Sequence, residues 1–308
     1  MSKAFVFPGQ GSQSVGMLSE LCEEFPIVFD TFSEASDALG YDLWSLVQYG
    51  PEDMLNSTDK TQPAMLAAGV AVWRVWNEKG GEKPSIMAGH SLGEYTALVC
   101  ANALSFAEGV KLVADRGHFM QEAVVGEQGA MAAILGLEDD KVIEICESAT
   151  QAQIVEAVNF NSPGQVVIAG DKAAVDRAIH AANEAGAKKT VLLPVSVPSH
   201  CSLMKPAAQQ LMARLADVTI STPAIPVIHN VNADVAGSPG QIKNLLVKQL
   251  YLPVQWVSCV NKIITTDVSA VIECGPGKVL AGLNKRIARR MPALPVFDTE
   301  SLAKALEN

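Results

Sequence analysis

The sequence predicts an α/β protein whose main sheet is largely parallel, and three observations lead to this class. Short apolar runs that suit buried strands alternate with segments that suit helices. Glycine-rich turns follow several of these runs, as they do where a helix follows a strand. The chain has 308 residues, of which 49% are hydrophobic and 18% charged, so it can bury a large core in one or two domains.

The first strand is expected at residues 3–7, and a glycine-rich loop follows it at 8–17. This loop is not a phosphate-binding motif, because Ser14 stands where G-x-G-x-x-G needs glycine and Met17 stands where Walker A needs lysine. A loop of this kind is either a plain turn or a segment that brings backbone N–H groups close to a ligand. In the second case the side-chain amide of Gln10 would add to the site.

A G-x-S-x-G pentapeptide at residues 89–93 lies between an expected strand at 85–88 and a helix-compatible segment at 94–100. Strand, sharp turn and helix are the context of a nucleophile elbow, in which Ser91 would be the nucleophile. The flanking glycines allow close backbone approach, and a helix N-terminus favours a developing oxyanion. Glu94 suits the first turn of that helix. The alternative is a glycine-rich turn with a capping serine.

Two further helices flank this motif. An apolar helix is expected to begin at residues 61–63 and to end at the glycine pair 80–81. A second helix starts at Ser105, because Ser105 and Glu108 have the spacing of a capping box. This helix contains Arg116, and an arginine on a helix most often lies on the surface. The local pattern therefore does not single out Arg116.

A different pattern occupies residues 129–195. Its expected elements follow the order β-α-β-β-α-β, at residues 130–135, 139–148, 154–160, 165–169, 173–185 and 189–193. This order is that of a ferredoxin-like domain. We therefore predict a large α/β-hydrolase-like domain with a parallel sheet, formed by residues 1–127 and 197–308. A small ferredoxin-like (βαββαβ) domain at residues 128–196 is inserted into it.

After the insertion, His200 lies on a proline-rich loop directly before a helix expected at 203–215. Its place on a loop makes His200 the best candidate base for Ser91. The other four histidines lie in helical segments, beside a strand or inside the pentapeptide. None of them forms an H-x-x-x-H or H-E-x-x-H pair, so no metal site is expected.

The C-terminal part returns to alternating strands and helices. Strands are expected at 226–232 and 268–273, and helices at 241–250 and from 278 to 289. Four basic residues at the end of the last helix stand out against a net charge of −10: Lys285, Arg286, Arg289 and Arg290. They form either a solvated helix face or a docking surface for an acidic partner.

Composition excludes several classes of protein. The acidic net charge of −10 argues against nucleic-acid binding. No apolar run approaches the roughly 18 residues that a membrane span needs, and the N-terminal apolar run is too short for a signal peptide. The 6 cysteines occur singly, so we expect them to be reduced. These observations predict a soluble, cytoplasmic protein that binds no membrane.

Five blocks of residues together resemble the malonyl-CoA:acyl carrier protein transacylases, the acyltransferase family of fatty acid and polyketide synthesis. These blocks are GQGSQ at 9–13, GHSLGEY at 89–95, PSH at 198–200, QLY at 249–251 and ECGPGKVL at 273–280. The resemblance extends from residue 3 to about residue 298, with the blocks in the family's order.

The resemblance implies a role for each matching position. Ser91 would be the nucleophile and His200 its base, with the backbone carbonyl of Gln249 orienting the imidazole in place of an Asp. The backbone N–H groups of Gln10 and Leu92 would form the oxyanion hole.

Three further positions are implied to contact the substrate. Arg116 would bind the free carboxylate of the malonyl group, because a guanidinium can hold a planar carboxylate through two parallel bonds. His90 and Ser199 would shape the pocket. The basic residues at 285–290 would then dock acyl carrier protein, which is acidic.

The activity implied is a ping-pong transfer of malonyl from malonyl-CoA to the phosphopantetheine thiol of acyl carrier protein, for fatty acid biosynthesis. Malonyl-CoA is a substrate, and no permanently bound cofactor is expected. The alternative is a serine esterase or thioesterase, which passes the acyl group to water. A scaffold that only binds a carrier protein would not need Ser91 or His200.

Overall fold

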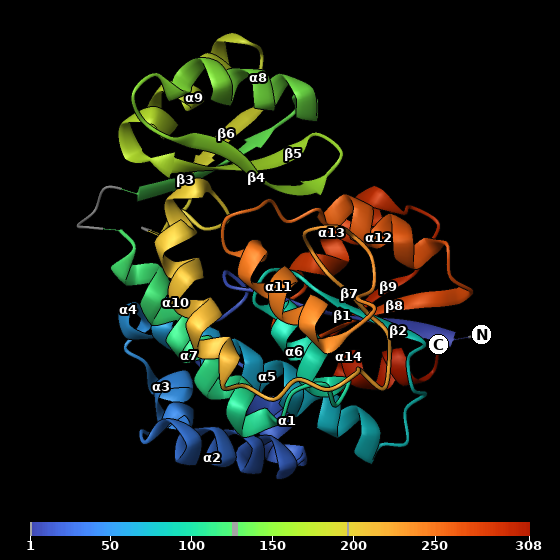
Figure 1. Ribbon diagram of the computed structural model, residues 1–308. Helices are drawn as coiled ribbons and strands as arrows, with labels where there is room; N and C mark the ends of the chain where they lie inside the picture. The colour runs from blue at the N-terminus through green and yellow to red at the C-terminus, as the bar shows by residue number, and fades with distance from the viewer. Residues whose placement is uncertain (1, 125–128, 196) are drawn as a thin grey trace.

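The computed structural model describes residues 2–124, 129–195 and 197–308. Two sheets organise it (Figure 1). The larger has the strand order β7-β2-β1-β8-β9 and the smaller the order β4-β5-β3-β6. Every neighbouring pair in the larger sheet is parallel, and every neighbouring pair in the smaller one is antiparallel. The predicted mixed α/β class with a parallel sheet is confirmed.

The larger sheet is covered on both faces. Its strands are β1 (Ser2–Phe7), β2 (Ile86–Gly89), β7 (Val227–Ile228), β8 (Val268–Cys274) and β9 (Ala293–Val296). Along β1, Phe5 and Phe7 enter one apolar cluster while Ala4 and Val6 enter another on the opposite face. A strand that is buried on both faces reads as a continuous apolar run, which is why residues 3–7 are recognisable in the sequence.

Most helices lie on one side of this sheet. They are α1 (Ser19–Glu24), α2 (Ile27–Leu39), α3 (Leu43–Tyr49), α4 (Glu52–Leu55), α5 (Thr58–Glu78), α6 (Gly93–Cys100), α7 (Phe106–Glu122), the 3₁₀ turn η1 (Ser202–Met204), α10 (Lys205–Ala216), α11 (Pro239–Gln249) and α14 (Thr299–Leu306). The other face is covered by α12 (Trp256–Ile264) and α13 (Val279–Ile287). No helix among the described residues is both long enough and apolar enough to cross a membrane.

The smaller sheet is formed by β3 (Gly129–Leu135), β4 (Val155–Ser162), β5 (Gln165–Asp171) and β6 (Lys189–Leu192). Helices α8 (Asp139–Thr150) and α9 (Lys172–Glu184) cover its outer face (Figure 1). Its inner face packs on Cys201 and Leu203, directly after His200 in the chain. The strand β4 also hydrogen-bonds to the main body, where the N–H of Phe160 donates to the carbonyl of Val254 at 3.0 Å. The small sheet therefore forms one wall beside the His200 loop.

The structure corrects one predicted helix start and one predicted helix cap. Helix α5 begins at Thr58, so Pro63 lies inside it and not at its first turn. Burial of a 21-residue helix outweighs the one backbone hydrogen bond that a proline removes. Helix α7 does begin after Ser105, but the Ser105 side chain makes no capping bond. The Glu108 carboxylate instead forms an ion pair with Arg214 of α10.

Two other predicted elements are shorter than expected. The strand expected at 226–232 ends at Ile228, because the next two residues turn inward and bond to Glu94. Helix α13 ends at Ile287, so Arg289 and Arg290 lie in the turn that follows it. The chain must reverse there before Pro292 and β9, and a proline disfavours helix in the residue before it.

The ends of β1 and β2 bring two backbone segments into contact. A Cβ atom at Gly93 would lie 2.0 Å from the carbonyl oxygen of Phe7, and one at Gly9 would lie 2.5 Å from the carbonyl oxygen of His90. The glycines of both loops are therefore required by close backbone approach. This contact brings the first glycine-rich loop beside Ser91.

We expect Gly93→Ala to lower the free energy of unfolding by about 3 kcal/mol, because the methyl group cannot fit without moving β1 or α6. Gly282→Ala is the matched control. Gly282 lies in α13, and beyond its neighbours and the backbone of its own helix no described atom lies within 4 Å of the place that a methyl group would take. The same change should therefore raise stability there by about 0.5–1 kcal/mol. Urea denaturation of the two variants measures both values, and equal stability would contradict the packing argument.

Candidate functional site

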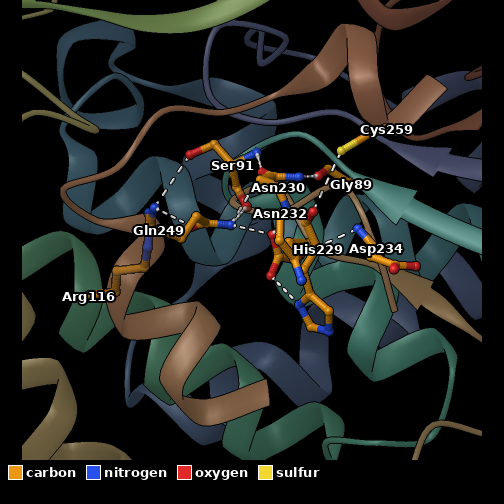
Figure 2. Close-up of polar contacts among 10 residues, drawn as sticks. Gly89, Ser91, Arg116, His229, Asn230, Asn232, Asp234, Gln249 and Cys259 are labelled. Atoms are coloured by element: carbon orange, nitrogen blue, oxygen red, sulfur yellow. Dashed lines mark hydrogen bonds and ion pairs between the residues drawn. The ribbon is translucent and has the colours of Figure 1, made fainter. Parts of the chain in front are cut away.

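Ser91 occupies a strained turn between β2 and α6. Its φ angle is 51°, in the left-handed region that side chains other than glycine avoid. Asn230 bonds to the backbone of this turn at two points (Figure 2). Its Oδ1 accepts a 2.7 Å hydrogen bond from the Ser91 N–H, and its Nδ2 donates to the Gly89 carbonyl at 2.7 Å. A Cβ atom at Gly89 would lie 1.9 Å from the backbone of Gly93. This is the geometry of a nucleophile elbow, as the sequence predicts.

His200 lies against the Ser91 hydroxyl. The Ser91 Oγ is 2.8 Å from His200 Nε2, and His200 Nδ1 is 2.6 Å from the backbone carbonyl of Gln249. A carbonyl only accepts hydrogen bonds, so Nδ1 must hold the proton and donate it. This tautomer leaves Nε2 free to accept the serine proton. The arrangement is that of a nucleophile, a base and a neutral group that orients the base.

The His200 imidazole is held in its neutral form. Burial, followed by the nearby positive charge of Arg116, lowers the pKa of His200 from 6.5 to about 3, against the opposing effect of the Gln249 carbonyl. A neutral imidazole is the form that can take a proton from Ser91.

Arg116 is buried beside the same hydroxyl, with 1% of its surface exposed. Its Nη1 donates to Gln62 Oε1 at 2.7 Å, and its Nη2 reaches Gln249 Oε1 at 3.1 Å and Ser91 Oγ at 3.4 Å. No carboxylate of the described residues forms an ion pair with it, and its Nε has no hydrogen-bond partner there. A surface position, which is usual for an arginine on a helix, is therefore wrong here.

An uncompensated buried cation at a nucleophile indicates a site for an anion. Removing a charge from water costs several kcal/mol, and a chain retains such a charge where a ligand supplies the counter-charge. The guanidinium also presents parallel donors, which suit a carboxylate. The site can therefore bind an acyl group that has a free carboxylate and place its other end at Ser91.

A cavity of about 100 Å³ joins these groups, and Gln10 and Leu92 also line it. The backbone N–H groups of Gln10 and Leu92 donate to no other atom of the described residues. Leu92 directly precedes the N-terminus of α6. Two free N–H groups beside a nucleophile are what stabilisation of an oxyanion requires.

His90 and Ser199 line the same cavity. The His90 Nε2 lies 2.8 Å from Asn161 Oδ1 on β4, and its ring lies 5.4 Å from the ring of Trp256. Burial lowers the pKa of His90, so its ring is neutral. The Ser199 hydroxyl donates to the Val197 carbonyl at 3.5 Å.

The basic residues near the C-terminus are not part of this cavity. Lys285, Arg286, Arg289 and Arg290 line a separate surface groove of about 740 Å³, together with Pro163 from the turn between β4 and β5. Arg286 Nη1 also donates to Gln165 Oε1 at 2.7 Å, so the groove lies between α13 and the small sheet. We call it the basic groove.

Four polar residues of the site escape sequence reasoning in part or whole. Gln62 and Asn230 are not predicted, Glu94 is expected only to suit a helix start, and Gln249 is expected to act only through its backbone. The one available signal was that Asn230 lies two residues after the end of a parallel strand. In the described part of the chain, no three or more His, Cys, Asp or Glu side chains lie together in a way that could hold a metal ion.

Comparison with known proteins identifies the family. A family model described as the acyl transferase domain matches residues 4–296. The malonyl CoA-acyl carrier protein transacylase of Salmonella typhimurium is 55% identical over 303 residues, which cover 98% of each chain. The relative of the same name in Bacillus subtilis is 45% identical over 309 residues, covering 100% of this chain and 97% of the other.

Solved structures agree with this match. A malonyl-transacylase in complex with its type II PKS acyl-carrier protein has a TM-score of 0.99 at 55% identity, with 100% of both chains covered. The malonyl-CoA:acyl carrier protein transacylase of Xanthomonas oryzae has a TM-score of 0.98 at 54% identity, with 99% and 98% covered. The chain therefore belongs to the acyl transferase domain family and, within it, to the malonyl CoA-acyl carrier protein transacylases.

Proposed function

We propose that this protein is a malonyl-CoA:acyl carrier protein S-malonyltransferase, which works through a malonyl-serine intermediate and supplies fatty acid biosynthesis. The observation that carries the proposal is the buried, uncompensated Arg116 guanidinium, 3.4 Å from the Ser91 hydroxyl. The relatives named for this activity, at up to 56% identity over nearly the whole chain, support the same reaction.

In the first half-reaction Ser91 attacks the thioester carbonyl of malonyl-CoA while its proton passes to His200 Nε2. The carbonyl oxygen becomes an oxyanion, which the N–H groups of Gln10 and Leu92 stabilise. When the C–S bond breaks, the CoA sulfur takes the proton from the imidazolium and leaves as a thiol. The Gln249 carbonyl keeps the imidazole oriented throughout, and a thiol leaves readily enough that a neutral orienting group suffices.

The second half-reaction reverses these roles. The phosphopantetheine thiol of acyl carrier protein gives its proton to His200 and attacks the malonyl ester. The C–O bond to Ser91 breaks, and His200 returns the proton to the serine oxygen. Ser91 is thereby regenerated, and the carrier protein leaves as the malonyl thioester.

Arg116 would select the acyl group. Arg116 lines the cavity and its Nη2 lies 3.4 Å from the Ser91 Oγ, so the malonyl carboxylate would complete an ion pair in a buried position. An acetyl group would leave the guanidinium buried and unpaired, which costs affinity and rate. A lipase or simple esterase gains nothing from this arrangement, so the serine hydrolase is not favoured. His90 and Ser199 would limit the shape of the pocket.

The finer description of the fold is also a proposal. The order β3-α8-β4-β5-α9-β6, with the strand order β4-β5-β3-β6, supports a ferredoxin-like small domain at 128–196. The elbow after β2 supports an α/β-hydrolase-like large domain at 1–127 and 197–308. Residues 127, 128 and 196, where these boundaries fall, lie outside the described residues.

The basic groove is our proposed docking surface for acyl carrier protein. The groove contains four basic side chains, although the net charge of the chain is −10. A carrier protein is acidic, so its charge would complement that of the groove. A solved relative is in complex with such a protein. A cytoplasmic location and the lack of a permanent cofactor stay predictions from the sequence.

Intact-protein mass tests the activity. Mixing with malonyl-CoA should add one malonyl group to the wild type and none to Ser91→Ala, and carrier protein should remove it faster than water does.

Arg116→Ala should lower the rate of malonyl transfer by at least about a hundredfold, since a charged hydrogen-bonded pair is lost. An adduct that water clears as fast as carrier protein does would instead indicate a hydrolase.

The lowered pKa of His200 predicts the pH profile. The base must be neutral, and its neutral fraction falls as the pH drops through its pKa, so a pKa of about 3 keeps His200 active at mildly acidic pH. We expect the burst rate of Ser91 acylation by 4-nitrophenyl acetate, which has no carboxylate, to be nearly constant from about pH 8 to about pH 5. An ordinary histidine would instead give a fall of about thirtyfold over this range.

Charge reversal tests the basic groove. Lys285→Glu combined with Arg289→Glu should raise the KM for carrier protein by about tenfold, because two attractive contacts become repulsive. Acylation of Ser91 by malonyl-CoA should not change. Lys172→Glu on α9, outside the groove, is the matched control and should leave both values unaltered. An unchanged KM in the groove variant would contradict the basic groove as the docking surface for carrier protein.

A further inference from the structure

Glu94 is a fully buried carboxylate in the polar network beneath Ser91. Its Oε1 accepts a bond from His229 Nδ1 at 2.6 Å. Its Oε2 accepts two more, from the Asn230 N–H at 2.9 Å and from Gln249 Nε2 at 2.8 Å. Three donors on one buried carboxylate exceed what a residue placed only to suit a helix N-terminus would need.

The Gln249 side chain lies between this carboxylate and the substrate-facing arginine. Its Nε2 donates to the Ser91 carbonyl at 3.0 Å, and its Oε1 accepts from Arg116 at 3.1 Å (Figure 2). The same Nε2 also donates to Glu94. A carboxylate only accepts and a guanidinium only donates, so the two neighbours together fix which way the amide points. Gln249 is itself fully buried, so water does not compete for these bonds.

We call the Gln249 side chain, which bonds to both Glu94 and Arg116, the bridge. The bridge orders the Arg116 guanidinium without neutralising its charge. Gln62 Oε1 holds one terminal nitrogen of the guanidinium and Gln249 Oε1 holds the other, so its plane is fixed by two neutral oxygens. The amide of Gln249 lies between Glu94 and Arg116, and the described residues show no ion pair between these two side chains. A direct Glu94–Arg116 pair would satisfy the charge that the substrate has to meet.

We propose that Glu94 is a positioning residue for substrate selection, which acts through the Gln249 side chain to aim the Arg116 guanidinium at the acyl carboxylate. This inference rests on the proposed function and deepens it. Gln249 then has two separate tasks, since its backbone carbonyl orients the base and its side chain orients the selecting cation. Loss of the bridge should therefore affect acyl groups that have a carboxylate more than those that lack one.

The test compares Ser91 acylation by malonyl-CoA with acylation by 4-nitrophenyl acetate in the same preparations. Gln249→Met keeps the backbone carbonyl and removes the bridge, so the ratio of the two rates should fall by about tenfold or more. Glu94→Gln keeps the shape of the side chain and turns a charge-assisted bond into a neutral one, so the ratio should fall by about threefold. The NH₂ group of the new amide can donate to His229 Nδ1 if the ring proton moves to Nε2. This change of tautomer breaks no bond, because His229 Nε2 has no partner in the described structure.

Two controls separate positioning from a general structural defect. Glu273→Gln removes another buried carboxylate, which accepts backbone N–H bonds from Leu280 and Ala281. Glu273 does not contact Gln249, so the ratio of the two rates should stay at the wild-type value. The double variant of Glu94→Gln and Gln249→Met should be no worse than Gln249→Met alone, because Glu94 acts through Gln249.

Each outcome decides for or against the inference. An unchanged ratio in both single variants overturns it, as does an equal fall in the two rates, which would indicate a structural role only. Additive effects in the double variant overturn the route through Gln249. A wild type that forms no malonyl adduct would instead contradict the proposed function, so the two failures are distinguishable.

Discussion

The left-handed turn at Ser91 is the constraint on which the rest of the site depends. A residue at φ 51° is stable only where its surroundings over-determine it. Here Asn230 bonds to the backbone on both sides of the turn, and Glu94 accepts a hydrogen bond from the Asn230 N–H. Gly89 allows the backbone before the turn to approach Gly93, and Gly93 allows the chain to approach β1. The strain is therefore borne by a buried polar network, and it points the serine hydroxyl at His200 and Arg116.

In the proposed function, Arg116 lowers the stability of the empty protein and raises its selectivity for the acyl group. A buried cation whose hydrogen-bond partners among the described residues are all neutral is unfavourable in the empty protein. The same charge lowers the pKa of the neighbouring His200. In the proposed reaction both effects would act together, since a neutral base can accept a proton and an unpaired guanidinium favours a substrate that has its own carboxylate. Electrostatics thus link the choice of substrate to the readiness of the nucleophile.

Much of the fold was predictable because its signals are local. The strand at 3–7, the elbow at 89–93 and the β-α-β-β-α-β order of residues 129–195 all follow from patterns within short windows. Predictions failed where a distant partner competed for a side chain or for the backbone. Glu108 bonds to Arg214 and not to its own helix start, and the chain after Ile228 turns toward Glu94 and leaves the sheet.

The sequence by itself determined the nucleophile and its setting, because glycine spacing and strand–helix order act over a few neighbouring residues. Together with the family resemblance it also indicated His200, Arg116 and the backbone of Gln249. Only the tertiary structure decided that Arg116 is buried with no counter-ion among the described residues, and that the side chain of Gln249 joins it to Glu94. These facts depend on residues as far apart as 62, 94, 116 and 249, and burial and hydrogen bonding between such positions arise only when the chain packs.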